Sequence, residues 1–157
     1  MIEFGKASKN QAHAPFLIKA EETADNCIRF IVSLSCEGEI GFNDITENGL
    51  GEILHEATPI YPDENEVFEI VFEHYILHQT RNESYCSFDD YEIKQGKYFV
   101  VFERSRLLDT LPMITDCQVL SGEGAYPGKW VHYGIYCQNH IIDIVSHNKP
   151  IIKKITG

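Results

Sequence analysis

The residues best able to do chemistry lie close together near the C-terminus of the chain. His132 and Tyr136 stand in a run of β-forming residues, and on a strand their spacing places them on one face. His140 follows the next turn, with Cys137 and Asp143 on either side of it. A base, an acid and a nucleophile this close are what a small hydrolase needs, so the hairpin 130–146 is the best place for an active site if the chain has one. The alternative is a half-exposed hairpin with aromatic side chains paired across its strands.

Two other patterns fail the tests for a metal or phosphate site. His74 and His78 have the i, i+4 spacing of two zinc ligands on a helix, but residue 75 is Tyr where the metalloprotease motif has its general base. The glycine-rich loop 121–129 ends in a Lys that no Ser or Thr follows, unlike a phosphate-binding loop. The sequence therefore predicts no bound metal and no cofactor. Because it also lacks a known catalytic motif, we predict no catalytic residue.

The distribution of charge is the most distinctive property of the chain. The whole chain has 24 acids and 13 bases, for a net charge of −11. The segment between Phe30 and Thr80 contains eleven Asp and Glu residues and no Lys or Arg. The rest of the chain therefore has equal numbers of acids and bases. A block of one sign attracts partners of the opposite sign. The acids in the block are Glu37, Glu39, Asp44, Glu47, Glu52, Glu56, Asp63, Glu64, Glu66, Glu69 and Glu73.

The second half of this block has the pattern of an amphipathic helix. Asp63 and Glu66 fit a capping box, and apolar residues then recur at helical spacing while Glu66, Glu69 and Glu73 fall together on the other side. We therefore expect a helix at about 64–80. A strand is the rival prediction, because the apolar residues are mainly Val, Phe and Ile.

Local interactions within this helix would not stabilise its glutamates. Glu69 and Glu73 are four residues apart and repel each other, with no Lys or Arg nearby in sequence. One interpretation is a solvated face paired with bases from elsewhere in the fold; the other is a docking surface for a basic protein. The docking surface would comprise Glu66, Glu69 and Glu73, then Asp63, Glu52 and Glu56, with Tyr61 as an aromatic anchor.

Most of the remaining chain has the alternation typical of strands. The sequence predicts one α+β domain, 1–157, in which a mostly antiparallel sheet packs against the long helix and a short helix lies near 105–111, ended by Pro112. Another short helix is expected at 47–56. Strands are expected at 16–19, 27–35, 39–42, 91–93, 97–103, 114–120, 130–137, 140–146 and 151–155.

Composition excludes several classes of function. A negative chain is a poor ligand for nucleic acid or an anionic membrane. No apolar run reaches the roughly 20 residues of a membrane helix, and the N-terminus lacks the pattern of a signal peptide. The five cysteines are odd in number and widely spaced, as in a protein with reduced thiols. These features favour a cytoplasmic protein.

In size, charge and lack of catalytic motifs the chain resembles bacterial immunity proteins that block toxin nucleases. That resemblance implies a binding protein whose acidic face occupies the positive cleft of a nuclease-like toxin. Complementary charge would speed this association. Two alternatives stay open. One is an accessory or homodimeric interaction domain without catalysis, in which an exposed sheet edge would form the dimer. The other is the hydrolase on the 130–146 hairpin.

Overall fold

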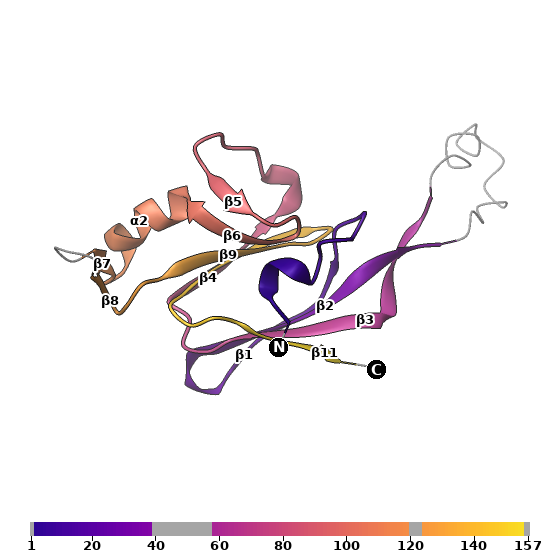
Figure 1. Cartoon of the computed structure of the whole chain (residues 1–157), viewed down its shortest axis with the longest axis horizontal. Coiled ribbons are helices and arrows are strands. Elements are labelled where there is room, and N and C mark those ends of the chain that lie inside the picture. The colour runs from indigo at the N-terminus through magenta and orange to yellow at the C-terminus, as the bar shows by residue number, and fades with distance from the viewer. Residues whose placement is uncertain (1, 39–57, 120–123, 156–157) are drawn as a thin grey trace.

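The computed structural model describes residues 2–38, 58–119 and 124–155, and its main elements are two antiparallel sheets packed face to face (Figure 1). The first sheet has four strands in the order β1-β2-β3-β11. Their bounds are Phe16–Thr23 for β1, Cys27–Glu37 for β2, Ile60–Phe72 for β3 and Ile151–Ile155 for β11.

The second sheet has five strands in the order β4-β10-β9-β6-β5. Its strands are β4 (Leu77–Asn82), β5 (Ile93–Gln95), β6 (Phe99–Arg104), β9 (Val131–Tyr136) and β10 (His140–Ser146). The other elements are helix α2 (Arg106–Ile114), the two-stranded β7 (Gln118–Val119) and β8 (Ala125–Tyr126), and the 3-10 turns η1 (Phe4–Lys6), η2 (Ala24–Asn26) and η3 (Glu83–Tyr85).

Alternating side chains of both sheets form the core between them. In β2, Phe30 and Val32 point inward and are almost completely buried. Across the sandwich, the rings of Phe72 and Tyr133 lie 5.3 Å apart between centroids. Each large apolar side chain buried here stabilises the fold by roughly 1.5–3 kcal/mol. The β-branched and aromatic residues that predict strands are thus also the residues that hold the sheets together.

The N-terminal turn η1 closes one end of this core. Phe4 is only 6% exposed, and its ring centroid lies 5.4 Å from that of Phe99 and 5.3 Å from that of Tyr133. The Ser8 hydroxyl accepts a hydrogen bond from the backbone N–H of Phe99 at 3.2 Å. These contacts make residues 4–8 part of the packed structure.

The predicted long helix at about 64–80 is wrong. Residues 60–72 form β3, and after a turn at His74 residues 77–82 form β4. β3 pairs with both β2 and β11, so that Phe68, Ile70 and Phe72 face the core with period two. A segment with two strand neighbours gains ladder hydrogen bonds and burial that a surface helix cannot match, and its β-branched and aromatic residues fit this state.

The other predicted elements have mixed outcomes. Strands at 16–19, 27–35, 130–137, 140–146 and 151–155 are confirmed, and so is the hairpin of β5 and β6. The short helix is confirmed, with Ser105 as its N-cap, but it continues past Pro112 to Ile114. The strand expected at 114–120 is therefore reduced to Gln118–Val119. The elements expected at 39–42 and 47–56 lie outside the described residues.

Among the described residues, no helix is both long enough and apolar enough to cross a membrane.

Candidate functional site

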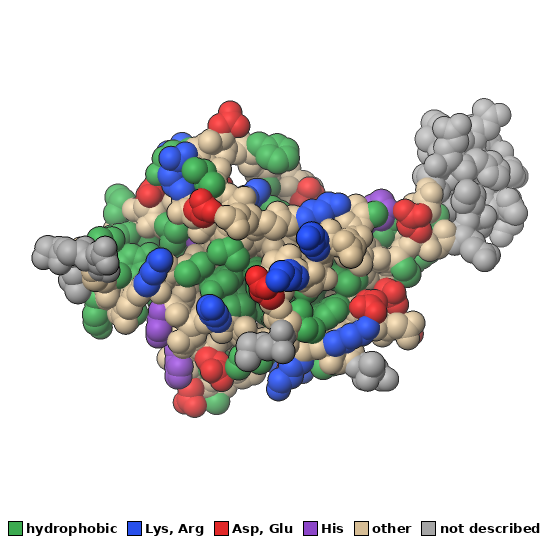
Figure 2. Space-filling model, in the orientation of Figure 1, with side chains coloured by type: hydrophobic (Ala, Val, Ile, Leu, Met, Phe, Trp, Pro, Cys, Tyr) green, Lys and Arg blue, Asp and Glu red, His purple; other side chains and the backbone are tan. Residues whose placement is uncertain are grey.

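Two of the predicted docking glutamates are paired with bases from distant strands. The carboxylate of Glu69 accepts a hydrogen bond from Arg29 Nε on β2 at 2.6 Å, and Arg29 also contacts Glu21 of β1 at 2.5 Å. Glu66 pairs with Lys154 of β11. Figure 2 shows acidic and basic side chains interleaved over the face in view. The charge that these two residues could present to a partner is therefore largely neutralised within the fold.

Glu73 lies too far from Tyr61 and Asp63 to share a patch with them. It follows the last residue of β3, whereas Asp63 lies near the first. At roughly 3.3 Å per strand residue, about 33 Å separate the two positions. Glu52 and Glu56 lie outside the described residues.

Tyr61 and Asp63 lie on a two-stranded projection formed by residues 35–38 and 58–65, here called the arm. Figure 1 shows the ends of β2 and β3 running beyond the rest of their sheet. The arm contains the acids Glu37, Asp63 and Glu64 and no Lys or Arg. Within the described residues its only pairing with a basic side chain is that of Glu37 with His13, at 3.0 Å. On the arm, Asp63 and Glu64 therefore keep their charge without a basic partner among the described residues.

The ring of Tyr61 lies against Gly38 on the arm. It packs so closely over Gly38 that a Cβ at position 38 would overlap the ring. The N–H of Gly38 donates to the carbonyl of Pro59 at 2.8 Å, which fixes the two strands of the arm against each other. Tyr61 is nevertheless 50% exposed. A large aromatic side chain with this exposure is available to a binding partner.

The paired histidines of the sequence do not form a site. His74 lies in the turn between β3 and β4 with φ of 52°, and His78 lies on β4. His78 Nε2 is 3.0 Å from the carboxylate of Glu22. In the part of the chain that the structure describes, no group of three or more His, Cys, Asp or Glu side chains is placed to hold a metal ion.

A buried polar network on the second sheet brings together Ser105, His132 and Asp143. His132 Nδ1 is 2.8 Å from Ser105 Oγ, and His132 Nε2 is 2.8 Å from Asp143 Oδ1. Arg81 and Gln79 both donate to Asp143 Oδ2 at 3.0 Å. Opposite Asp143 in the register stands Gly134, where any side chain would meet Val100 and Phe102.

The three residue types are those of a hydrolase triad, but their placement serves structure. Ser105 is completely buried, and its Oγ accepts a hydrogen bond from the N–H of Leu108 at 3.1 Å as the cap of α2. Burial raises the pKa of Asp143, but hydrogen bonds from His132 and Gln79 and the charges of His132 and Arg81 outweigh it, so the net pKa is lowered. The network therefore contains a carboxylate that is stable as an anion inside the protein.

A ten-residue segment, 83–92, crosses the outer face of the second sheet and is here called the strap. It connects β4 and β5, which are the two edge strands of the sheet. At about 4.8 Å per strand spacing, the crossing spans roughly 19 Å. Hollows lie on either side of it: a larger cleft of about 740 Å³ and a smaller one of about 360 Å³.

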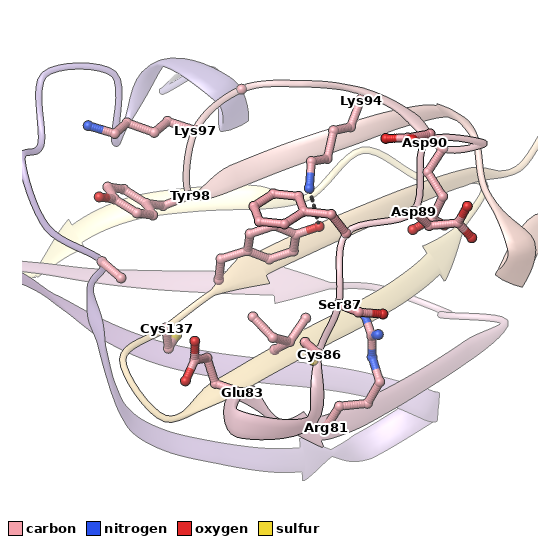
Figure 3. Close-up of a pocket in the computed structure, with 16 residues that line it drawn as sticks. Arg81, Glu83, Cys86, Ser87, Asp89, Asp90, Lys94, Lys97, Tyr98 and Cys137 are labelled. Atoms are coloured by element: carbon pink, nitrogen blue, oxygen red, sulfur yellow. Dashed lines mark hydrogen bonds between the residues drawn. The ribbon is translucent and has the colours of Figure 1, made fainter.

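The larger cleft, drawn in Figure 3, holds two of the residues that the hydrolase hypothesis names, Tyr136 and Cys137. Burial raises the pKa of Cys137 to about 12, so its thiol is protonated and unreactive at neutral pH. Burial also raises the pKa of Tyr136 to about 12. Lys94 Nζ lies 3.0 Å from the Tyr136 hydroxyl and 4.6 Å from the centroid of its ring. His132 and Asp143 line the smaller cleft, and His140 lines neither.

Sequence reasoning missed the aromatic residues of the strap. Phe88 is 97% exposed and Tyr85 is 88% exposed. No residue of the strap is buried. The sequence does contain a signal for them. Tyr85 and Phe88 lie in a polar segment whose apolar residues follow neither the period of a strand nor that of a helix. Large aromatic side chains in such a segment are not needed for a hydrophobic core.

Comparison of the chain with protein-family models, with curated proteins and with solved structures finds no match in any of the three.

Proposed function

We propose that the chain is a binding protein that inhibits a positively charged protein, such as a nuclease toxin, and that the arm makes the contact. The observation that carries this proposal is the exposed Tyr61 ring, which lies against Gly38 on a projection that has acids and no Lys or Arg. Tyrosine is the kind of residue that dominates binding energy at interfaces.

Charge supports the cationic partner. All 13 bases of the chain lie in its described parts, where 18 acids accompany them. The sequence between the two halves of the arm, 39–57, adds five acids and no base. Acids near an exposed aromatic residue would steer a basic partner toward it and raise the association rate.

The residues of the predicted docking set contribute unequally to this contact. Tyr61 and Asp63 become the central contacts, joined by Glu37 and Glu64. Glu66 lies at the base of the arm, where Lys154 competes for its carboxylate. The hydrolase has less support, because Ser105 is buried and the pKa of the Cys137 thiol is about 12.

An octa-arginine peptide, titrated into the isotope-labelled full chain, tests the proposal by nuclear magnetic resonance. We expect the largest shift changes at Tyr61 and Glu64 and weaker binding as salt is added. The double variant Asp63→Lys/Glu64→Lys should weaken binding by at least about tenfold.

The matched control changes the same number of charges on the strap, in the double variant Glu83→Lys/Asp90→Lys. Both residues lie far along the chain from the arm and are exposed. If both double variants weaken binding equally, the peptide senses only net charge, and the arm is not a docking site. Shift changes confined to the strap would contradict the proposal as well.

A further inference from the structure

We propose that two copies of the chain associate through the strap, with Phe88 of each copy seated in the larger cleft of the other. This inference concerns a different surface from the arm and does not depend on the proposed function. It rests on three observations: an exposed aromatic pair, a cleft beside it, and a local balance of charge.

The first observation is that the strap presents its aromatic side chains outward. Phe88 is 97% exposed and Tyr85 is 88% exposed, although both belong to a segment that lies over a sheet. Asp89 fixes the C-terminal part of the strap through Arg106, at 2.9 Å, and the Tyr91 ring lies 4.1 Å from the Arg106 guanidinium. Two large aromatics projecting from an anchored segment have the character of interface anchors.

The second observation is that the cleft lies directly beside these projections. Phe88 is one of the residues that line it, together with Tyr98, Tyr136 and Ile141. Figure 3 shows Tyr98, Lys94 and the strap residues Ser87 and Asp89 around this cleft. A knob and a hollow that adjoin each other on one face form a self-complementary surface. A two-fold axis passing between them places each Phe88 over the cleft of the opposite copy, which is the geometry of an isologous dimer.

The floor of the cleft suits an aromatic ring. Tyr136 and Ile141 offer apolar surface, and the Lys94 ammonium has no carboxylate partner among the described residues. Its Nζ already lies 5.9 Å from the Phe102 ring as well as over Tyr136. The ring of Phe88 from the second copy would add a further cation–π contact to the Lys94 ammonium.

The third observation is that charge permits two copies to meet on this face. Two molecules of net charge −11 repel each other, most of all through their acidic parts. The two clefts together are lined by five acids and four bases. Two of those acids are already paired, Asp89 with Arg106 and Asp143 with Arg81. The strap face is therefore nearly neutral, whereas two arms would bring like charges together.

Sedimentation equilibrium of the full chain over a series of concentrations tests the proposal. We expect a reversible dimer for the unmodified chain. Phe88→Ala removes both knobs of a symmetric interface, so the dimer dissociation constant should rise at least about a hundredfold. The substitution should leave the fold intact because the side chain is almost fully exposed; circular dichroism and the unfolding midpoint check this.

Tyr61→Ala is the matched control, since it removes an exposed aromatic residue from the arm. We expect it to leave the dimer unchanged while weakening octa-arginine binding, so failure of the two proposals can be told apart. A chain that stays monomeric up to about 1 mM has no such interface. A dimer that withstands Phe88→Ala, or one that Tyr61→Ala disrupts, overturns the proposed geometry.

Discussion

The outer faces of the two sheets carry similar ion pairs in opposite surroundings. On the first sheet, the side chains of Lys19, Glu21, Arg29 and Glu69 form a row of alternating charge across three strands, and all four are partly exposed to water. On the second sheet, Asp143 meets His132 and Arg81 beneath α2 and the strap, with only 1% of the Asp143 side chain exposed. The distances in the two groups are alike, between 2.5 and 3.0 Å.

The comparison shows that contact distance alone says little about the strength of an ion pair. In water, a pair gains little because both partners are well solvated when apart. In the interior, removing one partner leaves the other buried without compensation. Substitution of a charged residue on the first sheet should therefore change the free energy of unfolding little. Substitution of any member of the buried network on the second sheet should lower it substantially.

The largest expected effect is that of Asp143→Ala. This change leaves His132 without an acceptor for Nε2 and frees Arg81, and it should lower the free energy of unfolding by about 3–5 kcal/mol. Urea denaturation monitored by circular dichroism measures the change. A loss below about 1 kcal/mol would mean that the buried network stabilises the fold no more than a surface pair does.

Lowering the pH should weaken the same network without a mutation. The folded-state pKa of Asp143 lies below its ordinary value of 3.8. Its contribution to stability is therefore complete above that value and is lost as the pH falls through the folded-state pKa. Urea midpoints from neutral pH downward should converge for the unmodified chain and Asp143→Ala. Parallel curves at acid pH would contradict this assignment.

Ser105→Ala should have an intermediate effect. It removes the cap of α2 and one of the two hydrogen bonds of His132, and the loss of a cap lowers stability by about 1 kcal/mol. Thr110→Ala is the control in the same helix, since its exposed hydroxyl only donates to the carbonyl of Arg106. Thermal unfolding should separate the two variants, and equal midpoints would show that the cap is unimportant.

The smallest effect is expected for Glu69→Ala on the first sheet. Arg29 keeps its contact with Glu21 in this variant and stays accessible to water. The unfolding midpoint should shift by little more than the error of measurement. A loss as large as that of Asp143→Ala would mean that the row of charges acts as one unit and that the contrast between the sheets is false.

The sequence predicts much of the sheet structure because local alternation decides it. β2, β9 and β10 have runs of β-branched and aromatic residues bounded by turns, and their strands form where expected. The helix prediction for β3 is wrong because the apolar residues of this segment have a spacing that fits a helix almost as well as it fits a strand. The deciding contacts, with β2 and β11, come from segments far away in the chain.

The candidate sites were predictable only in part, for a similar reason. Tyr61 and Asp63 belong to the predicted docking set because the acidic block is continuous in sequence, and their role in binding stays a prediction. The pairing of Glu69 with Arg29 could not, since it needs the register of two strands. Asp143 has the ordinary alternation of a strand residue, and nothing local shows that α2 and the strap cover it.

The position of Phe4 affects the order in which the molecule can be completed during synthesis. Its ring packs against Phe72, Phe99 and Tyr133, which a ribosome adds progressively later. Phe4 must therefore stay exposed to chaperones and to other nascent chains until Tyr133 has emerged from the ribosome. We expect that any extension fused ahead of Phe4 will interfere with this last docking step more than one placed after β11.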